Sequence, residues 1–242
     1  MKLTLTKKIL EAKNTISLYF KCEKKIDWLP GQYFYYTLPT LNYPDPKGST
    51  RQFTIASSPT EDTMILTTKI REESGFKKTL NEIQIGQTVE GDGPSGTFIL
   101  DQEKHMPQVF LAGGIGITPF RSFIKYAIDK AYKTPIFLLY SNSTPEEIAY
   151  KNELDSWAKT NPNFKIIYTI SKPEESKIKW TGNVGRIDSK TILEASTNFG
   201  FDIKNTTFWV CGPPPMVTTM EQILWKLKIS TDNIVSEKFT GY

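Results

Sequence analysis

The chain has 242 residues but only two cysteines, Cys22 and Cys211, and one histidine, His105. Two cysteines far apart in the sequence exclude a four-cysteine iron–sulfur cluster and a CxxC redox pair within the chain. A single histidine excludes histidine-rich metal sites and weakens any mechanism based on a Ser-His-Asp or Cys-His arrangement. We therefore expect no metal site, and we expect difficult chemistry to be carried by a bound cofactor.

Long apolar runs are also missing. No stretch approaches the roughly 18 apolar residues that a membrane-spanning helix needs, and the N-terminal Met1–Thr4 is not an apolar signal region. We expect a cytoplasmic protein without a membrane span. The 30 basic and 26 acidic residues are interspersed, so no nucleic-acid partner is expected. The net charge of +4 fits an ordinary lysine-rich surface better than a docking surface for an acidic partner.

What the chain does contain is two contrasting patterns, each long enough for one domain. The first hundred residues are short β-type runs separated by turn residues, a spacing typical of an antiparallel barrel. We place the strands at residues 3–10, 15–21, 32–38, 52–56, 64–70 and 97–100, one helix at 76–83, and a tight glycine and proline loop at 91–96.

After residue 107 the pattern becomes apolar strand followed by amphipathic helix. This alternation predicts a parallel sheet covered by helices on both faces. We place strands at 108–112, 135–140, 164–171 and 207–211, and helices at 119–132, 145–160, 189–195 and 214–227.

The first of these strand-to-helix turns is rich in glycine. Apolar Val109–Ala112 leads into Gly113, Gly114 and Gly116, followed by Thr118 and Pro119. Glycines let a backbone approach a pyrophosphate closely, and a helix N-terminus offers free N–H groups at the positive end of its dipole. Pro119 fits the first turn of a helix, and Thr118 is able to cap it or to donate to a phosphate. Close packing between helix and strand also favours glycine, so this loop alone does not decide the matter.

A second loop supports a nucleotide site. The last clear strand ends in Cys211 and Gly212, and Pro213 and Met216 follow at the start of the next helix. The carboxyl ends of parallel strands face one crevice, so we expect this loop and Gly113–Thr118 to share a ligand. A free cysteine is more often a small buried apolar residue, and that alternative stays open for Cys211.

These two loops resemble the GGxGxTP and CGPxxM loops of the ferredoxin-NADP reductase family, and the resemblance extends over nearly the whole chain. It implies an N-terminal antiparallel Greek-key β-barrel that binds FAD, at residues 1–103. It also implies a C-terminal Rossmann-like parallel-sheet domain that binds NAD(P), at residues 107–242. The cofactors implied are FAD and NAD(P)H.

The family's flavin signature, Arg-x-aromatic-Ser/Thr, is similar to Arg51, Gln52, Phe53 and Thr54. The resemblance implies that Arg51 binds the FAD pyrophosphate, that Phe53 stacks on the isoalloxazine, and that the Thr54 hydroxyl lies near flavin N5. The family more often has tyrosine at the position of Phe53, so one hydroxyl contact is lost. The alternative is that these residues only cover a barrel face.

A second flavin segment, Gly75–Leu80, resembles the family's loop-to-helix segment that holds the FAD pyrophosphate. The FAD-binding residues expected here are Gly75, Phe76, Lys77 and Thr79, although Lys77 also fits a solvated helix position. The preceding Thr68, Lys69 and Ile70 are expected to run beside the flavin, mainly through their backbone groups.

The C-terminal segment supplies the remaining part of the resemblance. Glu237 and Phe239 are similar to a carboxylate and an aromatic residue that the family brings to the flavin, and Tyr242 is an alternative shield for the flavin ring. An ordinary edge strand that ends in aromatic residues is the competing interpretation. Thr54, Cys211 and Glu237 are the expected catalytic residues, because hydride transfer requires the two rings to be held in register.

The sequence does not decide between NADH and NADPH, which differ in a 2′-phosphate. The candidates for the ribose side are Ser141, Lys172 and Arg186. The expected function is hydride transfer between NAD(P)H and FAD, followed by single-electron steps with a separate redox protein such as a ferredoxin. The alternatives are reduction of free flavin, quinone or another small acceptor, and a non-catalytic dinucleotide-binding subunit.

Overall fold

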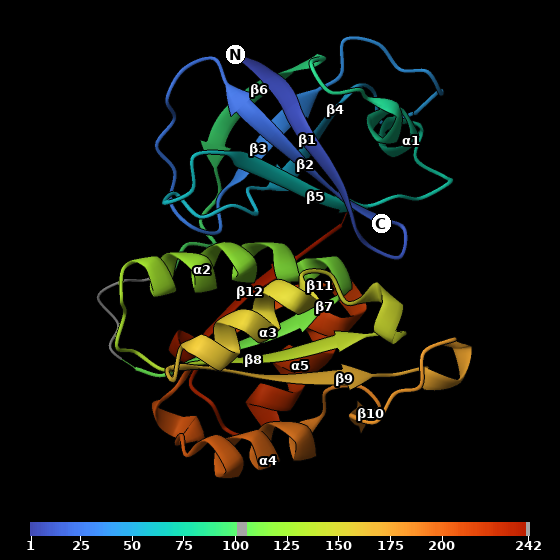
Figure 1. The fold of residues 1–242 in the computed structure, drawn as a ribbon. Helices are drawn as coiled ribbons and strands as arrows, with labels where there is room; N and C mark the ends of the chain where they lie inside the picture. The colour runs from blue at the N-terminus through green and yellow to red at the C-terminus, as the bar shows by residue number, and fades with distance from the viewer. Residues whose placement is uncertain (101–105, 241–242) are drawn as a thin grey trace. The chain divides into compact units, whose positions relative to one another are not determined.

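The computed structural model describes residues 1–100 and 106–240 and divides the chain into two compact units (Figure 1). Unit 1 consists of Met1–Leu100 and Arg121–Asp129, and unit 2 consists of Asp101–Phe120 and Lys130–Tyr242. Helix α2 (Ile117–Asp129) is therefore divided between the two units. The boundaries expected from the sequence, 1–103 and 107–242, place this helix wholly in the second domain.

Unit 1 is built on an antiparallel sheet of six strands in the order β4-β3-β6-β1-β2-β5. The edge strands β4 and β5 meet at a bridge between Ile55 and Leu66, and the Ala56 amide donates to the Ile65 carbonyl at 2.8 Å. These contacts close the sheet and confirm the predicted antiparallel barrel. The strands are β1 (Lys2–Ala12), β2 (Thr15–Cys22), β3 (Tyr33–Thr37), β4 (Thr50–Thr54), β5 (Met64–Lys69) and β6 (Thr88–Ser95).

The barrel core follows from alternation along the strands. In β3 the buried Phe34 and Tyr36 alternate with half-buried neighbours, as expected for a strand with one face inward. Helix α1 (Gly75–Glu82) adds Phe76 and Leu80 to the same core. This helix begins one residue before its predicted start, because Ser74 caps it by accepting from the Lys77 amide.

The last strand of unit 1 corrects two expectations. Residues 97–100 do not form a strand, and the predicted loop 91–96 lies mostly inside β6. The pairing of β6 with β3 is irregular between Tyr33 and Tyr35, so the strand accommodates glycines that resemble a loop in sequence. Gly91 is required by packing, because a Cβ there would lie 2.5 Å from the Phe34 ring.

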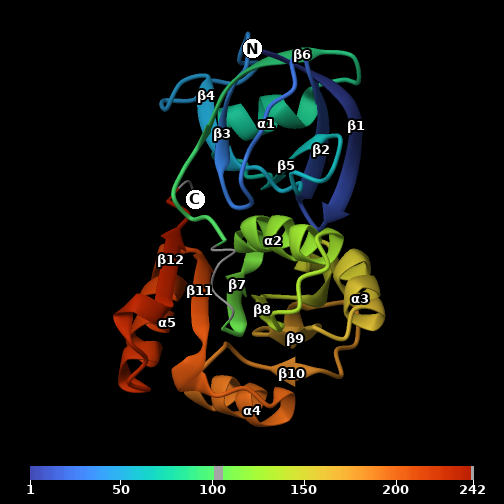
Figure 2. The same ribbon diagram turned by 90° about the vertical axis from the view of Figure 1, so that its left-hand side faces the viewer.

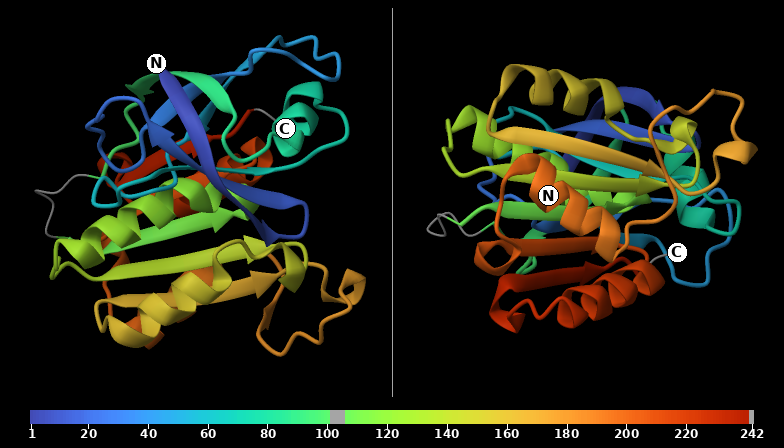
Figure 3. Two further views of the ribbon diagram at one scale, coloured as in Figure 1. Left: turned by 45° about the horizontal axis from the view of Figure 1, so that its top comes forward. Right: turned by 90° about the horizontal axis from the view of Figure 1, so that it is seen from below.

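Unit 2 contains a parallel sheet of six strands in the order β10-β9-β8-β7-β11-β12 (Figure 2). Helices α4 and α5 cover one face of this sheet, and α3 lies on the other (Figure 3). The strands are β7 (Gln108–Gly113), β8 (Ile136–Asn142), β9 (Phe164–Ile170), β10 (Asn183–Val184), β11 (Thr207–Gly212) and β12 (Ile234–Lys238). The helices are the first turn of α2, with α3 (Lys151–Thr160), α4 (Ser189–Phe199) and α5 (Pro214–Lys226).

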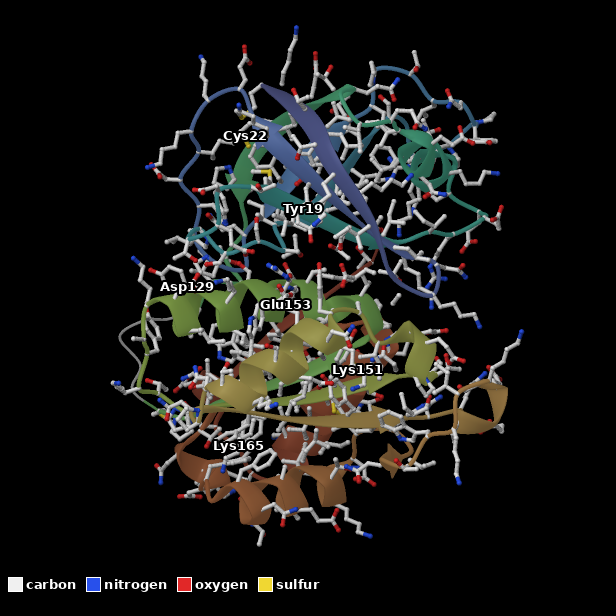
Figure 4. The ribbon with its side chains drawn as sticks, in the orientation of Figure 1. Tyr19, Cys22, Asp129, Lys151, Glu153 and Lys165 are labelled. Carbon is white, nitrogen blue, oxygen red and sulfur yellow. The ribbon has the colours of Figure 1, made fainter. Side chains whose placement is uncertain are left out.

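The central strands of unit 2 are continuous apolar runs because helices cover both of their faces. Every residue of β7 and β11 is buried. Phe137 stacks on Phe199 and Phe201 beside α4, and Lys165 of β9 lies 5.4 Å from the Phe199 ring centroid (Figure 4). The predicted Rossmann-like sheet is thus confirmed. The periodic pattern did not show the short edge strand β10.

Within residues 1–100 and 106–240, no helix combines the length and the apolar character needed to cross a membrane.

A buried ion pair joins two segments of unit 1. The Arg121 guanidinium, with 3% of its side chain exposed, donates to both carboxylate oxygens of Glu61 at 2.8 and 3.0 Å and to the Ala56 carbonyl. Next to it, the Ser122 hydroxyl donates to the Ser57 carbonyl at 2.7 Å. These bonds tie residues 121–129 to the segment that directly follows β4.

We predict that Glu61→Gln lowers the free energy of unfolding by about 3 kcal/mol, because it removes a carboxylate charge to which the buried Arg121 guanidinium donates two hydrogen bonds. Urea unfolding measures this change. The matched control is Glu90→Gln, which alters an exposed acid on β6 and is expected to stay within about 0.5 kcal/mol of the wild type. Equal effects of the two variants would contradict the importance of the ion pair.

Candidate functional site

The glycine-rich loop of unit 2 forms a short turn at the carboxyl end of β7. Gly114 has φ of +51°, a left-handed conformation that favours glycine, and a Cβ added there would meet nothing within 4 Å. The backbone at Gly114 is therefore open to a ligand. Pro119 lies in the first turn of α2, as predicted. The Thr118 hydroxyl donates to the Ile115 carbonyl at 3.1 Å, so in this conformation it serves the turn itself.

Two glycines bring this loop against the end of β11. A Cβ at Gly116 would lie 2.3 Å from the Cys211 carbonyl oxygen, and one at Gly113 would lie 2.4 Å from the Met216 sulfur. Gly212 meets the same sulfur and the Gly113 backbone. The loops that the sequence predicts to share a crevice are thus in direct contact, and Pro213 and Met216 lie next to Gly113.

Cys211 and Glu237 lie side by side at this edge, because β11 and β12 pair in parallel with these two residues in register. Cys211 is fully buried. Burial raises the pKa of Glu237 to about 7, and its Oε2 is buried without a hydrogen-bond partner among the described residues. Burial, and next the Glu237 charge, raises the pKa of the Cys211 thiol. At neutral pH the site therefore holds a neutral thiol beside a carboxyl group that is about half protonated.

The chain continues past β12 along the same edge, where the Phe239 amide donates to the Gly212 carbonyl at 3.0 Å. This places Phe239, which is half-buried, beside the two loops. Tyr242, the alternative shield, lies outside the described residues. Whether Phe239 or Tyr242 shields the flavin ring therefore stays open.

The candidates for the ribose side follow β8 and β9. Ser141 is half-buried in β8 and its hydroxyl accepts from Thr169 at 3.5 Å. The Lys172 ammonium pairs with Glu175 at 2.8 Å, and this bond and the carboxylates of Glu175, Glu174 and Glu147 raise its pKa. Arg186 is exposed and follows Gly185.

Sequence reasoning missed Asn142, the last residue of β8. Its side chain is 5% exposed, and neither amide atom has a hydrogen-bond partner among the described residues. A buried amide is normally paired, so an unpaired one at the carboxyl edge of the sheet fits a polar ligand. A lone asparagine that ends an apolar strand carries no sequence signal of its own.

In unit 1 the flavin signature lies on β4. Thr54 is 6% exposed, Arg51 and Phe53 are half-buried, and Gln52 is exposed. The Phe53 ring packs against Tyr36 and Phe76, with 5.9 Å between ring centroids in both pairs. Thr68 is buried in β5, and Lys69 and Ile70 are half-buried at its end.

The start of α1 differs from the expected phosphate-binding turn. The Phe76 amide donates to Asp45 at 2.9 Å, and the Lys77 amide donates to the Ser74 hydroxyl at 3.2 Å. The Thr79 hydroxyl donates to the Gly75 carbonyl and accepts from the Asn42 amide. Gly75 is required by the approach of the preceding loop, since a Cβ there would lie 2.3 Å from the Pro44 carbonyl oxygen.

Positive side chains nevertheless gather at this helix start. Burial lowers the pKa of Lys77 to about 8, and the nearby cations Arg71, Arg51 and Lys47 lower it further, against Glu73. Such crowding of like charges is what a bound diphosphate relieves. The residues present therefore fit the FAD pyrophosphate through their side-chain charges. Thr54 belongs to unit 1 while Cys211 and Glu237 belong to unit 2, so their joint action stays a prediction.

Among residues 1–100 and 106–240, no group of three or more His, Cys, Asp or Glu side chains is placed to hold a metal ion.

Comparison with known proteins is consistent with this geometry. Residues 2–99 match the sequence model of the oxidoreductase FAD-binding domain, and residues 110–222 match that of the oxidoreductase NAD-binding domain. The chain is 33% identical over 178 residues to NADH-cytochrome b5 reductase 1 of Cryptococcus neoformans, covering 71% of this chain and 60% of that protein. It is 31% identical over 194 residues to the Mortierella alpina protein of the same name, covering 79% and 63%. The chain thus spans about three fifths of these relatives.

Solved structures share the fold over nearly the whole chain. The cytochrome b5 reductase domain of Ulva prolifera nitrate reductase has a TM-score of 0.81 at 24% identity, covering 98% of this chain and 96% of that one. A ferredoxin NADP+ reductase from Neisseria gonorrhoeae with bound FAD and NADP also has a TM-score of 0.81, at 18% identity and 98% coverage of both chains.

We predict that Glu237 makes stability fall as pH rises. The folded chain binds this proton below pH about 7, whereas an unfolded glutamate binds it only below about 4.3. Between these values the folded state holds more protons, so the free energy of unfolding decreases with increasing pH and the loss is complete above 7. Glu237→Gln should remove this dependence and be more stable than the wild type at pH 8, on the order of 1–2 kcal/mol after allowing for solvent screening.

Urea unfolding at pH 4.5 and pH 8 measures the effect. Glu194→Gln, on the exposed face of α4, is the control that removes one carboxylate from unit 2 without touching the site. Parallel pH profiles for wild type, control and Glu237→Gln would contradict the raised pKa.

Proposed function

Because this chain belongs to the ferredoxin-NADP reductase family of flavoprotein oxidoreductases, we propose that it transfers hydride from a nicotinamide dinucleotide to FAD and passes the electrons singly to a separate acceptor protein. The observation that carries this proposal is the contact between Gly116 and the Cys211 carbonyl, which joins the phosphate-binding turn to the Cys211–Glu237 pair. A ligand bound across both loops would have its pyrophosphate at one and its reacting ring at the other.

Each group at this edge has a role in the proposal. The open backbone at Gly114 and the first turn of α2 bind the dinucleotide pyrophosphate. The buried Cys211 thiol packs beside the reacting ring, and Glu237 holds a proton at its half-buried carboxyl group. Bound FAD supplies the change from two-electron to one-electron chemistry. In unit 1, Arg51 and Lys77 would hold its pyrophosphate and the Phe53 ring its isoalloxazine.

We propose NADH as the preferred dinucleotide. Residues 143–147, which follow β8, contain Glu146 and Glu147 and no cation. An acid at this place suits the free 2′-hydroxyl of NADH and repels the 2′-phosphate of NADPH. The nearby Lys172 is already paired with Glu175. The name of the Cryptococcus and Mortierella relatives, NADH-cytochrome b5 reductase 1, supports the same choice.

The acceptor is proposed to be a small one-electron carrier. The relatives' name favours a cytochrome b5 over the ferredoxin suggested by the sequence motifs. Direct reduction of free flavin or quinone is the second candidate, and it needs no protein docking surface. We propose that the protein acts in the cytoplasm.

The experiment is turnover of the FAD-loaded protein with NADH or NADPH, using cytochrome b5, ferredoxin or free flavin as acceptor. We expect kcat/KM for NADH to exceed that for NADPH by about tenfold or more. We also expect cytochrome b5 to be reduced faster than ferredoxin or free flavin. Absence of turnover with every acceptor would refute the proposed function.

Two variants test the 2′-side within the same experiment. Glu175→Gln frees Lys172 and should improve kcat/KM for NADPH relative to NADH, whereas Glu194→Gln, which breaks a similar exposed Lys–Glu pair on α4, should leave the ratio unchanged. Arg186→Ala should raise KM for NADPH more than for NADH if Arg186 meets the 2′-phosphate. If the kinetic constants for NADPH and NADH changed equally, Lys172 and Arg186 would not be residues that contact the ribose.

A further inference from the structure

Asp45 lies in the loop between β3 and β4, outside every motif noted in the sequence. Its carboxylate side chain is only 4% exposed, although Asp45 is not part of the barrel core. It accepts from the Arg51 Nη2 at 2.5 Å, the Phe76 amide at 2.9 Å, the Lys47 amide at 3.0 Å and the Ser74 hydroxyl at 3.2 Å. One buried carboxylate thus links β4, its preceding loop and the start of α1.

The residues directly before Asp45 are bound to α1. The Asn42 amide donates to the Thr79 hydroxyl at 3.0 Å, and the Asn42 side chain and the Tyr43 hydroxyl donate to Glu82. Next to them Pro44 contacts Gly75 so closely that no Cβ would fit there. The position of Asp45 is therefore set in part by the contacts of the three residues directly before it.

Asp45 fixes the orientation of Arg51. Nη1 of Arg51 donates to the carbonyls of Lys47, Gly48 and Thr50, and Nη2 donates to Asp45, so the guanidinium plane is held at several points. Among residues 1–100 and 106–240, no acceptor bonds to the Arg51 Nε. The side chain is 18% exposed. A diphosphate that approaches Arg51 thus meets a donor that is already oriented.

The charge balance leaves room for a diphosphate in spite of Asp45. Burial alone would raise the pKa of Asp45, but the amides of Phe76 and Lys47 and the Arg51 charge hold it below its ordinary value, so the group is ionised at neutral pH. The cations Lys47, Arg51, Arg71 and Lys77 outnumber the neighbouring acids Asp45 and Glu73. Asp45 reduces the mutual repulsion of these cations without cancelling their charge.

We propose that Asp45 is a positioning residue for the flavin diphosphate: it holds the Arg51 guanidinium in the arrangement that receives the cofactor. This inference rests on the proposed function, because it takes FAD as the ligand of unit 1. It predicts that Asp45 strengthens FAD binding, whereas charge repulsion alone would have the opposite effect. A carboxylate that only repelled the diphosphate would weaken FAD binding, and its removal would tighten it. A positioning carboxylate strengthens binding through Arg51.

The test is FAD binding by flavin-free protein, followed as quenching of flavin fluorescence. We expect Asp45→Ala to raise the Kd for FAD about tenfold or more, and Asp45→Asn, which keeps one acceptor oxygen, to have an intermediate effect. Asp92→Asn removes an exposed acid of the same unit and is expected to leave the Kd unchanged. Tighter or unchanged binding by Asp45→Asn and Asp45→Ala would overturn the proposal.

A double-mutant comparison separates positioning from general damage to unit 1. If Asp45 acts through Arg51, the variant with both Asp45→Ala and Arg51→Ala should bind FAD no more weakly than Arg51→Ala alone. Additive losses would overturn the proposal, since they would mean that Asp45 acts independently of Arg51. Failure of the wild-type protein to bind FAD is a different result, because it would refute the proposed function itself.

Discussion

The structure of unit 2 depends on one close approach between two backbones. Gly116, in the turn after β7, lies so near the Cys211 carbonyl that no other residue would fit without a shift of one strand end. This contact joins the glycine-rich turn to the end of β11, and the parallel register then places Glu237 beside Cys211. The open backbone at Gly114 and the Cys211–Glu237 pair, for which we propose a pyrophosphate and a reacting ring as ligands, therefore share one edge of the sheet.

Unit 1 meets a different constraint, the burial of charge. Cations gather at the start of α1. Burial, and next the charges of these neighbours, lowers the pKa of Lys77 to about 8. The helix amides do not relieve this crowding, because Asp45 and Ser74 occupy them. The proposed anion site of unit 1 therefore depends on side-chain charge held in place by hydrogen bonds, whereas the proposed site of unit 2 depends on open backbone. The two sites differ in kind although we propose a pyrophosphate as the ligand of both.

The sequence predicted features that depend on short-range pattern. Apolar runs predicted the central strands of unit 2. Glycine and proline patterns predicted the two loops at its sheet edge, because close packing in these loops allows few residue types. It failed where tertiary contacts decide: Gly91 reads as a loop residue but pairs within β6, because Phe34 leaves no room for a side chain. Asp45 and Asn142 escaped notice because their importance comes from partners, or missing partners, that only the folded chain shows.

We propose that this chain binds FAD in unit 1 and that a nicotinamide dinucleotide bound at the Gly116–Cys211 contact reduces this FAD. The most direct measurement is the visible absorbance of the purified protein during titration with NADH in the absence of oxygen. We predict a yellow protein whose flavin absorbance is bleached by about one equivalent of NADH, because hydride transfer delivers both electrons at once. A colourless protein, or a yellow one whose absorbance NADH leaves unchanged, would contradict it.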